Sequence, residues 1–186
     1  MAEPAAARVG VVDPARFGDL CSDLGALLAQ AVESGAGVDF VLPFSAADGA
    51  AWWRAQEPDL ASGRRVVLVA RVDGELVGTA SLLPAVAPNQ SHRADVSKLL
   101  VAPPWQGRGV ATLLMGGLMD VARARGRTLL TLDCVAGCPA EALYRTLGFT
   151  VVGRIPGYAV SPDGVPEAAT FLYRDLTMAA GPPWSG

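Results

Sequence analysis

The feature that most constrains the fold is a β-hairpin predicted within residues 64–84, RRVVLVARVDGELVGTASLLP. Two runs rich in valine and leucine flank Asp73-Gly74, and an Asp-Gly pair in that position is typical of a two-residue type I′ turn. A two-residue turn joins neighbouring antiparallel strands. The sheet of this protein is therefore expected to contain an antiparallel pair in the first half of the chain.

The rest of the chain carries alternating strand and helix patterns. Further strands are expected at residues 8–13, 93–101, 127–135, 149–155 and 169–176. Four helices are expected: one at residues 14–34, one after the capping residue Ser45, one that begins within residues 101–115 and ends at about Arg125, and one at residues 139–147. Residues 156–168 are interpreted as a loop. This order predicts an α+β protein with a mixed sheet. No linker divides it, so we expect one domain over residues 1–176 and a flexible tail at 177–186.

Composition and charge exclude several classes of protein. Hydrophobic residues make up 51% of the chain and charged residues 18%, which is incompatible with a disordered chain. No apolar run approaches the roughly 18 residues that a membrane span needs. The net charge is −3 and no long block of Lys or Arg occurs, so no nucleic-acid partner is expected. The N-terminus lacks the pattern of a signal peptide, which favours a cytoplasmic location.

The cysteines do not form a metal-binding pattern. Cys134 and Cys138 are four residues apart, but His92 is the only histidine and no second cysteine pair accompanies them. We expect no metal, and free thiols in a reducing compartment.

A glycine loop joins a predicted strand to a predicted helix in VAPPWQGRGVATLLM, residues 101–115. The free N–H groups and the dipole of a helix N-terminus favour a bound phosphate, and glycines let the backbone approach it closely. The glycines could also serve the turn alone. A Walker A loop is excluded because Val110-Ala111 replace the required Lys-Ser or Lys-Thr. A Rossmann loop is excluded because the third glycine is missing.

Two motifs in the second half of the chain resemble those of one enzyme superfamily. Gln106-x-x-Gly109-x-Ala111 resembles the Q/R-x-x-G-x-G/A pyrophosphate loop of the GNAT N-acetyltransferases, and AEALYRTLGF (residues 140–149) resembles their A-x-x-L-Y-x-x-L-G-F signature. The resemblance implies the GNAT fold, with a mixed, mostly antiparallel sheet of about seven strands and about four helices. It also implies acetyl-CoA as co-substrate and an acetyltransferase activity toward amines.

The resemblance assigns roles by position. Tyr144 would protonate the leaving thiolate, although Gly137 stands where the family often has an asparagine. The residues implied for acetyl-CoA are Leu99, Leu100 and Val101 along the pantetheine, and Gln106, Gly107, Arg108, Gly109, Val110, Ala111 and Thr112 around the pyrophosphate.

Aminolysis of a thioester needs a neutral amine, so a group must remove a proton from the ammonium. Asp95 is the first candidate, because family members with a carboxylate base place a glutamate there; Asp133, at the end of the next strand, is the second. Each could instead form an ion pair or cap a turn. In a strand without a bulge, Asp95 and Ser97 would lie on one face, and Val96, Lys98 and Leu100 on the other.

Residues 89–164 resemble the tabtoxin-resistance branch of the family, which acetylates a β-lactam toxin and pairs a glutamate with an aspartate at the two carboxylate positions. The resemblance favours a small-molecule amine as acceptor, in antibiotic or toxin detoxification, and allows a homodimer. An acetyltransferase for protein N-termini or lysines and a non-catalytic acyl-CoA sensor are the alternatives. The residues expected at the acceptor are Phe44, Trp53, His92, Arg93 and Tyr158.

Overall fold

The computed structural model describes residues 6–177. They form one seven-stranded sheet with the strand order β1-β2-β3-β4-β5-β7-β6. Only β4 and β5 run parallel, and all other neighbours are antiparallel. The strands are β1 Arg8–Val11, β2 Val66–Val72, β3 Glu75–Pro84, β4 Arg93–Val101, β5 Leu129–Val135, β6 Thr150–Val160 and β7 Pro166–Asp175. The predicted mixed sheet of the α+β class is thus confirmed, whereas residues 178–186 of the predicted tail lie outside the described part of the chain.

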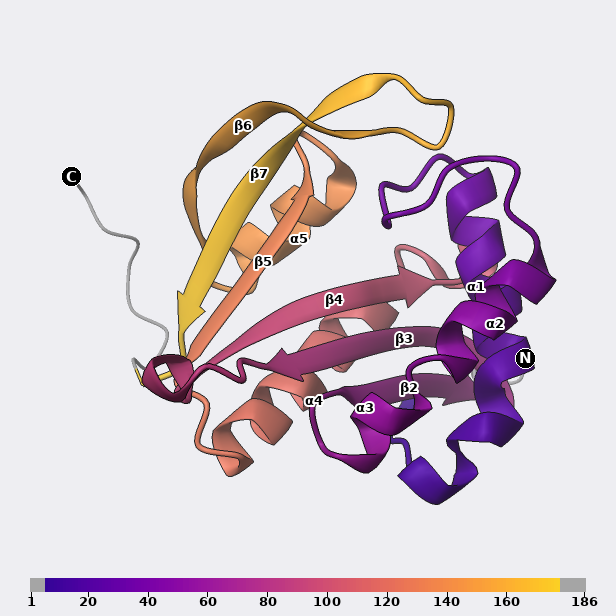
Figure 1. Ribbon diagram of the computed structural model, residues 1–186, viewed down its shortest axis with the longest axis horizontal. Helices are drawn as coiled ribbons and strands as arrows, with labels where there is room; N and C mark the ends of the chain where they lie inside the picture. The colour runs from indigo at the N-terminus through magenta and orange to yellow at the C-terminus, as the bar shows by residue number, and fades with distance from the viewer. Residues whose placement is uncertain (1–5, 178–186) are drawn as a thin grey trace.

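Helices cover both faces of the sheet (Figure 1). They are α1 Cys21–Glu33, α2 Ala46–Arg54, the single turn α3 Glu57–Ala61, α4 Val110–Ala124 and α5 Pro139–Thr146. Four of them have eight or more residues, in agreement with the number expected from the sequence; α3 was not predicted.

Two hydrophobic clusters hold these layers together. One joins α4 and α5 to the sheet and contains Leu114, Leu118 and Leu130 among its fully buried residues. The other joins α1 and α2 to the opposite face and contains Leu28 and Trp53. Strands β2, β3 and β4 contribute residues to both clusters and so pack on both sides, which explains why β2 is apolar at consecutive positions.

The turn and the helix cap that the sequence predicted are both present in the structure. Asp73 and Gly74 both have positive φ angles, 49° and 87°, as a type I′ turn requires. The side chain of Ser45 accepts a hydrogen bond from the N–H of Asp48, and the Asp48 carboxylate accepts one from the N–H of Ser45, so the capping box at α2 is complete.

The prediction of a loop at residues 156–168 was wrong for most of these residues. β6 continues through Pro156 to Val160, β7 starts at Pro166, and only residues 161–165 connect them. β6 is an edge strand, where a proline without an N–H need not remove a ladder hydrogen bond. Its pairing with β7 is irregular between Ile155 and Ala159, which accommodates the Pro-Gly pair.

None of the helices within residues 6–177 is both long enough and apolar enough to cross a membrane.

Candidate active site

The two parallel strands β4 and β5 separate in the middle of the sheet. They pair only between Arg93–Asp95 and Leu129–Thr131, and beyond these residues they diverge (Figure 1). A cavity of about 930 Å³ lies here, lined by both strands, the loop before α4, α5 and the connection from α1 to α2. The split therefore brings together segments that lie far apart in the sequence.

The loop before α4 presents unused N–H groups to the cavity. Within the described part of the chain, the N–H groups of residues 107–112 donate to no protein acceptor. Gly107 and Gly109 have φ angles of +70° and +81°, and a Cβ on either would meet no atom within 4 Å. The backbone is therefore open to a ligand at the start of a 15-residue helix, whose dipole favours an anion.

Two residues of this loop have other contacts. Gln106 uses its N–H to bond the carbonyl of Pro103 at 3.3 Å, and its Nε2 to bond the carbonyl of Val101 at 3.1 Å. The Arg108 guanidinium lies 5.2 Å from the centre of the Trp105 ring. Gln106 thus fixes the loop to the end of β4, and Arg108, unlike Gly107 and Gly109, does not line the cavity.

A β-bulge interrupts β4 at Lys98. Thr79 pairs with Leu100 while Ser81 pairs with Ser97, so two residues of β4 oppose one of β3, and Lys98 has a φ angle of 53°. Val96 packs in the α4 cluster and Leu100 in the α1 cluster. The alternation expected for an unbulged strand, with Val96, Lys98 and Leu100 on one face, is therefore corrected.

Asp133 lies on β5 and lines the cavity. Its side chain is open to solvent on the cavity side, and it takes part in none of the ion pairs within residues 6–177. Protein atoms around it raise the pKa of its carboxyl, and the nearby carboxylate of Asp39 raises it further. Asp133 is therefore a stronger base than an ordinary aspartate.

Asp95 has a different environment. Its Oδ1 lies 2.6 Å from Nη1 of Arg93 and accepts a hydrogen bond from the hydroxyl of Thr131, opposite it on β5. Its side chain is 44% exposed, and it is not among the cavity-lining residues. Asp95 closes the narrow end of the split, where the two strands still pair, and its charge is balanced by Arg93.

Tyr144 reaches the cavity from α5 and is almost fully buried. Burial raises the pKa of its phenol, with a further contribution from the neighbouring Cys134, so the group is a neutral O–H donor. Cys134 and Cys138 also line the cavity as free thiols, and a hydrogen bond from Cys134 lowers the pKa of Cys138. Within the described residues no three His, Cys, Asp or Glu side chains are grouped so that they could hold a metal ion.

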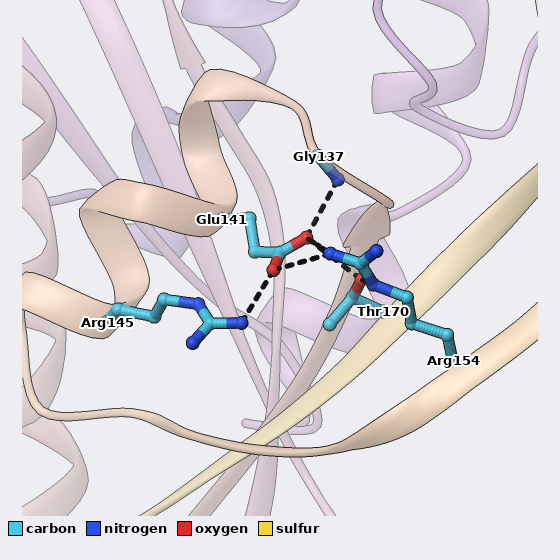
Figure 2. Close-up of polar contacts among 5 residues, drawn as sticks. All are labelled: Gly137, Glu141, Arg145, Arg154 and Thr170. Atoms are coloured by element: carbon cyan, nitrogen blue, oxygen red, sulfur yellow. Dashed lines mark hydrogen bonds and ion pairs between the residues drawn. The ribbon is translucent and has the colours of Figure 1, made fainter.

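A buried carboxylate holds the turn that leads into α5 (Figure 2). Glu141 accepts hydrogen bonds from the N–H of Gly137 at 2.8 Å and the hydroxyl of Thr170 at 2.9 Å. It also forms ion pairs with Arg145 at 2.9 Å and Arg154 at 3.1 Å. This network fixes α5 against β6 and β7, and with it the position of Tyr144. The sequence analysis did not identify it, because its members are spread over 34 positions, from Gly137 to Thr170.

The two tryptophans of α2 have different locations. Trp53 is completely buried, and its Nε1 donates to the carbonyl of Leu24 at 3.1 Å. It therefore belongs to the core, and its assignment to the acceptor site is corrected. Trp52 instead lies beside the cavity-lining Lys98, with the Lys98 ammonium 5.0 Å from its ring centre. Phe44 is half-buried and stacks against Phe40 at 4.4 Å, without lining the cavity.

The remaining residues expected at the acceptor lie outside the cavity. The His92 side chain is exposed, and its carbonyl accepts hydrogen bonds from Thr128 and Leu129. Arg93 bonds Asp95, Thr131 and Gln90. Tyr158 is exposed on β6 and packs edge-on against Phe171 at 4.9 Å. The structure thus brings Asp133 and Tyr144 to the cavity, whereas His92, Arg93 and Tyr158 do not line it.

Comparison with known protein sequences agrees with this arrangement. The sequence profile of the acetyltransferase (GNAT) family matches residues 37–149. An uncharacterized N-acetyltransferase of the hisH-hisA intergenic region of Azospirillum brasilense is 32% identical over 124 residues, or 66% of this chain and 71% of that protein. The L-amino acid N-acetyltransferase AaaT of Escherichia coli (strain K12) is 33% identical over 96 residues, or 50% of this chain and 58% of that protein.

The fold has close counterparts among solved structures. The yncA protein of Salmonella typhimurium, solved with its cofactor acetyl-CoA, has a TM-score of 0.74 and 24% identity, over 96% of this chain and 98% of that one. At this level of identity the likeness shows that the two chains share a fold.

Proposed function

The chain belongs to the acetyltransferase (GNAT) family and is an N-acetyltransferase, and on this premise we propose that it transfers the acetyl group of acetyl-CoA to the primary amine of a small molecule. The observation that carries the proposal is the cavity at the split of the sheet. Its lining includes the N-terminus of α4, the carboxylate of Asp133 and the phenol of Tyr144. Groups that could bind an anion, accept a proton and donate a proton therefore line the same cavity.

The residues of the cavity fit acetyl-CoA. The N–H groups of residues 107–112 donate to no protein atom in the described structure, and they would hold the pyrophosphate. The diverging strand at Leu99–Val101 lines the same cavity and would pair with the pantetheine. When bound, acetyl-CoA supplies the acetyl group as a thioester.

Asp133 and Tyr144 have complementary proton chemistry. An alkyl ammonium is mostly protonated at neutral pH, and the carboxylate of Asp133, whose pKa is raised, would accept its proton directly or through water. The neutral phenol of Tyr144 would donate a proton to the departing thiolate. Asp95, paired with Arg93, would keep the narrow end of the split in place.

Two observations favour a small acceptor that resembles an amino acid. Residues 35–39 between α1 and α2 line the cavity, and Leu42 in the same segment is hydrogen-bonded to the β6–β7 turn. The segment therefore crosses this side of the cavity. An extended protein substrate would need an open groove there. The 33% identical relative is an L-amino acid N-acetyltransferase. Detoxification of an amine-bearing toxin, as in the tabtoxin-resistance branch, is the narrower form of this proposal.

A thiol-release screen tests the proposal. Acetyl-CoA is incubated with amino acids, polyamines, amine-bearing antibiotics and an N-terminal peptide, and products are identified by mass spectrometry. We expect acetylation of an amino-acid-like amine. Acetylation of the peptide alone would indicate a protein acetyltransferase, and binding of acetyl-CoA in calorimetry without any turnover would indicate a sensor. No binding at millimolar acetyl-CoA would overturn the co-substrate assignment.

A further inference from the structure

Lys98 is the only lysine in the sequence, and it is buried. Its side chain is 3% exposed, although it lies at the bulge of β4 on the wall of the cavity. A charged ammonium is removed from water at a high energetic cost unless protein groups replace its hydration. The contacts of Lys98 therefore show what this charge stabilises.

Within residues 6–177, the hydrogen bonds and ring contacts of the ammonium all lie in or beside the segment between α1 and α2. Nζ donates to the carbonyl of Val38 at 3.0 Å and to the carboxylate of Asp39. The same atom lies 5.3 Å from the ring centre of Phe40 and 5.0 Å from that of Trp52, where cation–π attraction adds to the hydrogen bonds. Three consecutive residues are thus held by one ammonium. We call the segment of residues 36–42 the strap.

The strap is attached at two further points, one at the end of β5 and one in the turn between β6 and β7. A Cβ placed on Gly37 would lie 2.5 Å from Cγ2 of Val135, so the strap backbone passes directly against the end of β5. The N–H of Leu42 donates to the carbonyl of Pro162, in the turn between β6 and β7, at 2.9 Å. Since Lys98 belongs to β4, the strap connects the two halves of the sheet that diverge at the split (Figure 1).

The strap also forms a wall of the cavity. Gly37, Val38 and Asp39 line it together with Lys98 and Asp133. The Asp39 side chain is 80% exposed and its φ angle is 76°, so the lysine holds this residue in a conformation that is rarely adopted without glycine. Without the ammonium, nothing else found in the described structure ties Asp39 to β4.

We infer that Lys98 is a positioning residue for the acceptor, which holds the strap across the split and so sets the wall of the cavity next to Asp133. The inference rests on the proposed function, because it assumes that the amine binds beside Asp133. A displaced strap would leave the acetyl-CoA loop before α4 unchanged while enlarging the acceptor side. The loss should therefore appear in the KM for the amine.

The test compares Lys98→Met, Asp39→Asn and the control Asp19→Asn, which changes an exposed aspartate at a surface ion pair with Arg16. We expect KM for the best amine of the screen to rise about tenfold or more in the first two variants, with KM for acetyl-CoA unchanged, and no change in the control. Equal KM values for the amine in all proteins, or a loss confined to kcat, would overturn the inference.

Hydrogen exchange provides a readout that does not depend on activity. In Lys98→Met the peptide containing Leu42 should exchange faster than in the wild type, while peptides of α4 exchange at the same rate. Unchanged exchange of the strap would refute the anchoring role even in an active enzyme. If Lys98→Met does not fold, Asp39→Asn decides, because its side chain is exposed. A wild type that acetylates no amine defeats the proposed function, and strap exchange then still decides the anchoring role of Lys98.

Discussion

The carboxylate of Glu141 accepts a 2.8 Å hydrogen bond from the main-chain N–H of Gly137, which ties the turn after β5 to the first turn of α5 (Figure 2). The same carboxylate pairs with Arg145 and Arg154, from α5 and β6. The hydrogen bond from Gly137, followed by the arginines and Thr170, lowers the pKa of Glu141 to about 2. Its ionised form is therefore coupled to folding.

Replacing Glu141 by Gln should lower stability in a pH-dependent way. A depressed pKa in the folded state contributes stability above the unfolded value of 4.5, and this contribution is lost as the pH falls towards 2. Thermal unfolding should show a lower Tm for Glu141→Gln at pH 7 and a narrowing difference from the wild type between about pH 4.5 and 2. The control Glu75→Gln, at an exposed hairpin position, should show no such narrowing. A Tm difference that stays constant with pH would contradict the assignment.

Two glycines in helices, one packed against a neighbouring helix and one with free space around it, should respond to alanine in opposite ways. A Cβ on Gly25 would lie 2.4 Å from the backbone nitrogen of Ala50, whereas a Cβ on Gly116 in α4 would meet nothing within 4 Å. Gly25→Ala should therefore lower the free energy of unfolding by about 1–3 kcal/mol or more, because backbone cannot move aside easily. Gly116→Ala should raise it by about 0.5–1 kcal/mol through helix propensity. Urea denaturation measures both, and a neutral Gly25→Ala would show that the helices separate without cost.

Local signals were enough to predict most elements of the fold. Asp73-Gly74, the capping pair Ser45 and Asp48, and Gly126 after α4 all act within a few residues, so the sequence displays them directly. The sheet edge was harder, because Pro156 is compatible with a strand only where no neighbour needs its N–H.

The site was only partly predictable, for a related reason. Whether Trp52 or Trp53 enters the core depends on the rotation of α2, which is set by its close contact with α1 through Gly25 and Gly49. The bulge at Lys98 depends on the register between β3 and β4. Each of these is a property of two segments together, and neither segment alone carries it.

The loop before α4 predicts a loss of acetyl-CoA affinity when its backbone is strained. Gly109 has a φ angle of +81° at the start of the helix, and a non-glycine residue there costs about 1–2 kcal/mol. Gly109→Ala should weaken acetyl-CoA binding in calorimetry about tenfold. Gly126→Ala is the matched control, since Gly126 has a φ angle of +70° at the other end of the same helix. Equal affinities for acetyl-CoA in both variants would contradict the assignment of this loop to acetyl-CoA binding.

The role proposed for Asp133 predicts how kcat/KM depends on pH. In the proposed role of proton acceptor Asp133 has to be ionised, and its raised pKa should move the acid limb of kcat/KM above the ordinary aspartate value of 3.8. Asp133→Asn should lower kcat/KM about 10²–10⁴-fold and remove that limb, while the affinity for acetyl-CoA remains. Asp95→Asn is the isosteric comparison, because it breaks the pair with Arg93 outside the cavity; it should reduce activity less and keep the limb. If Asp95→Asn instead removes the limb and Asp133→Asn keeps it, the proton passes to Asp95 and the cavity carboxylate has another role.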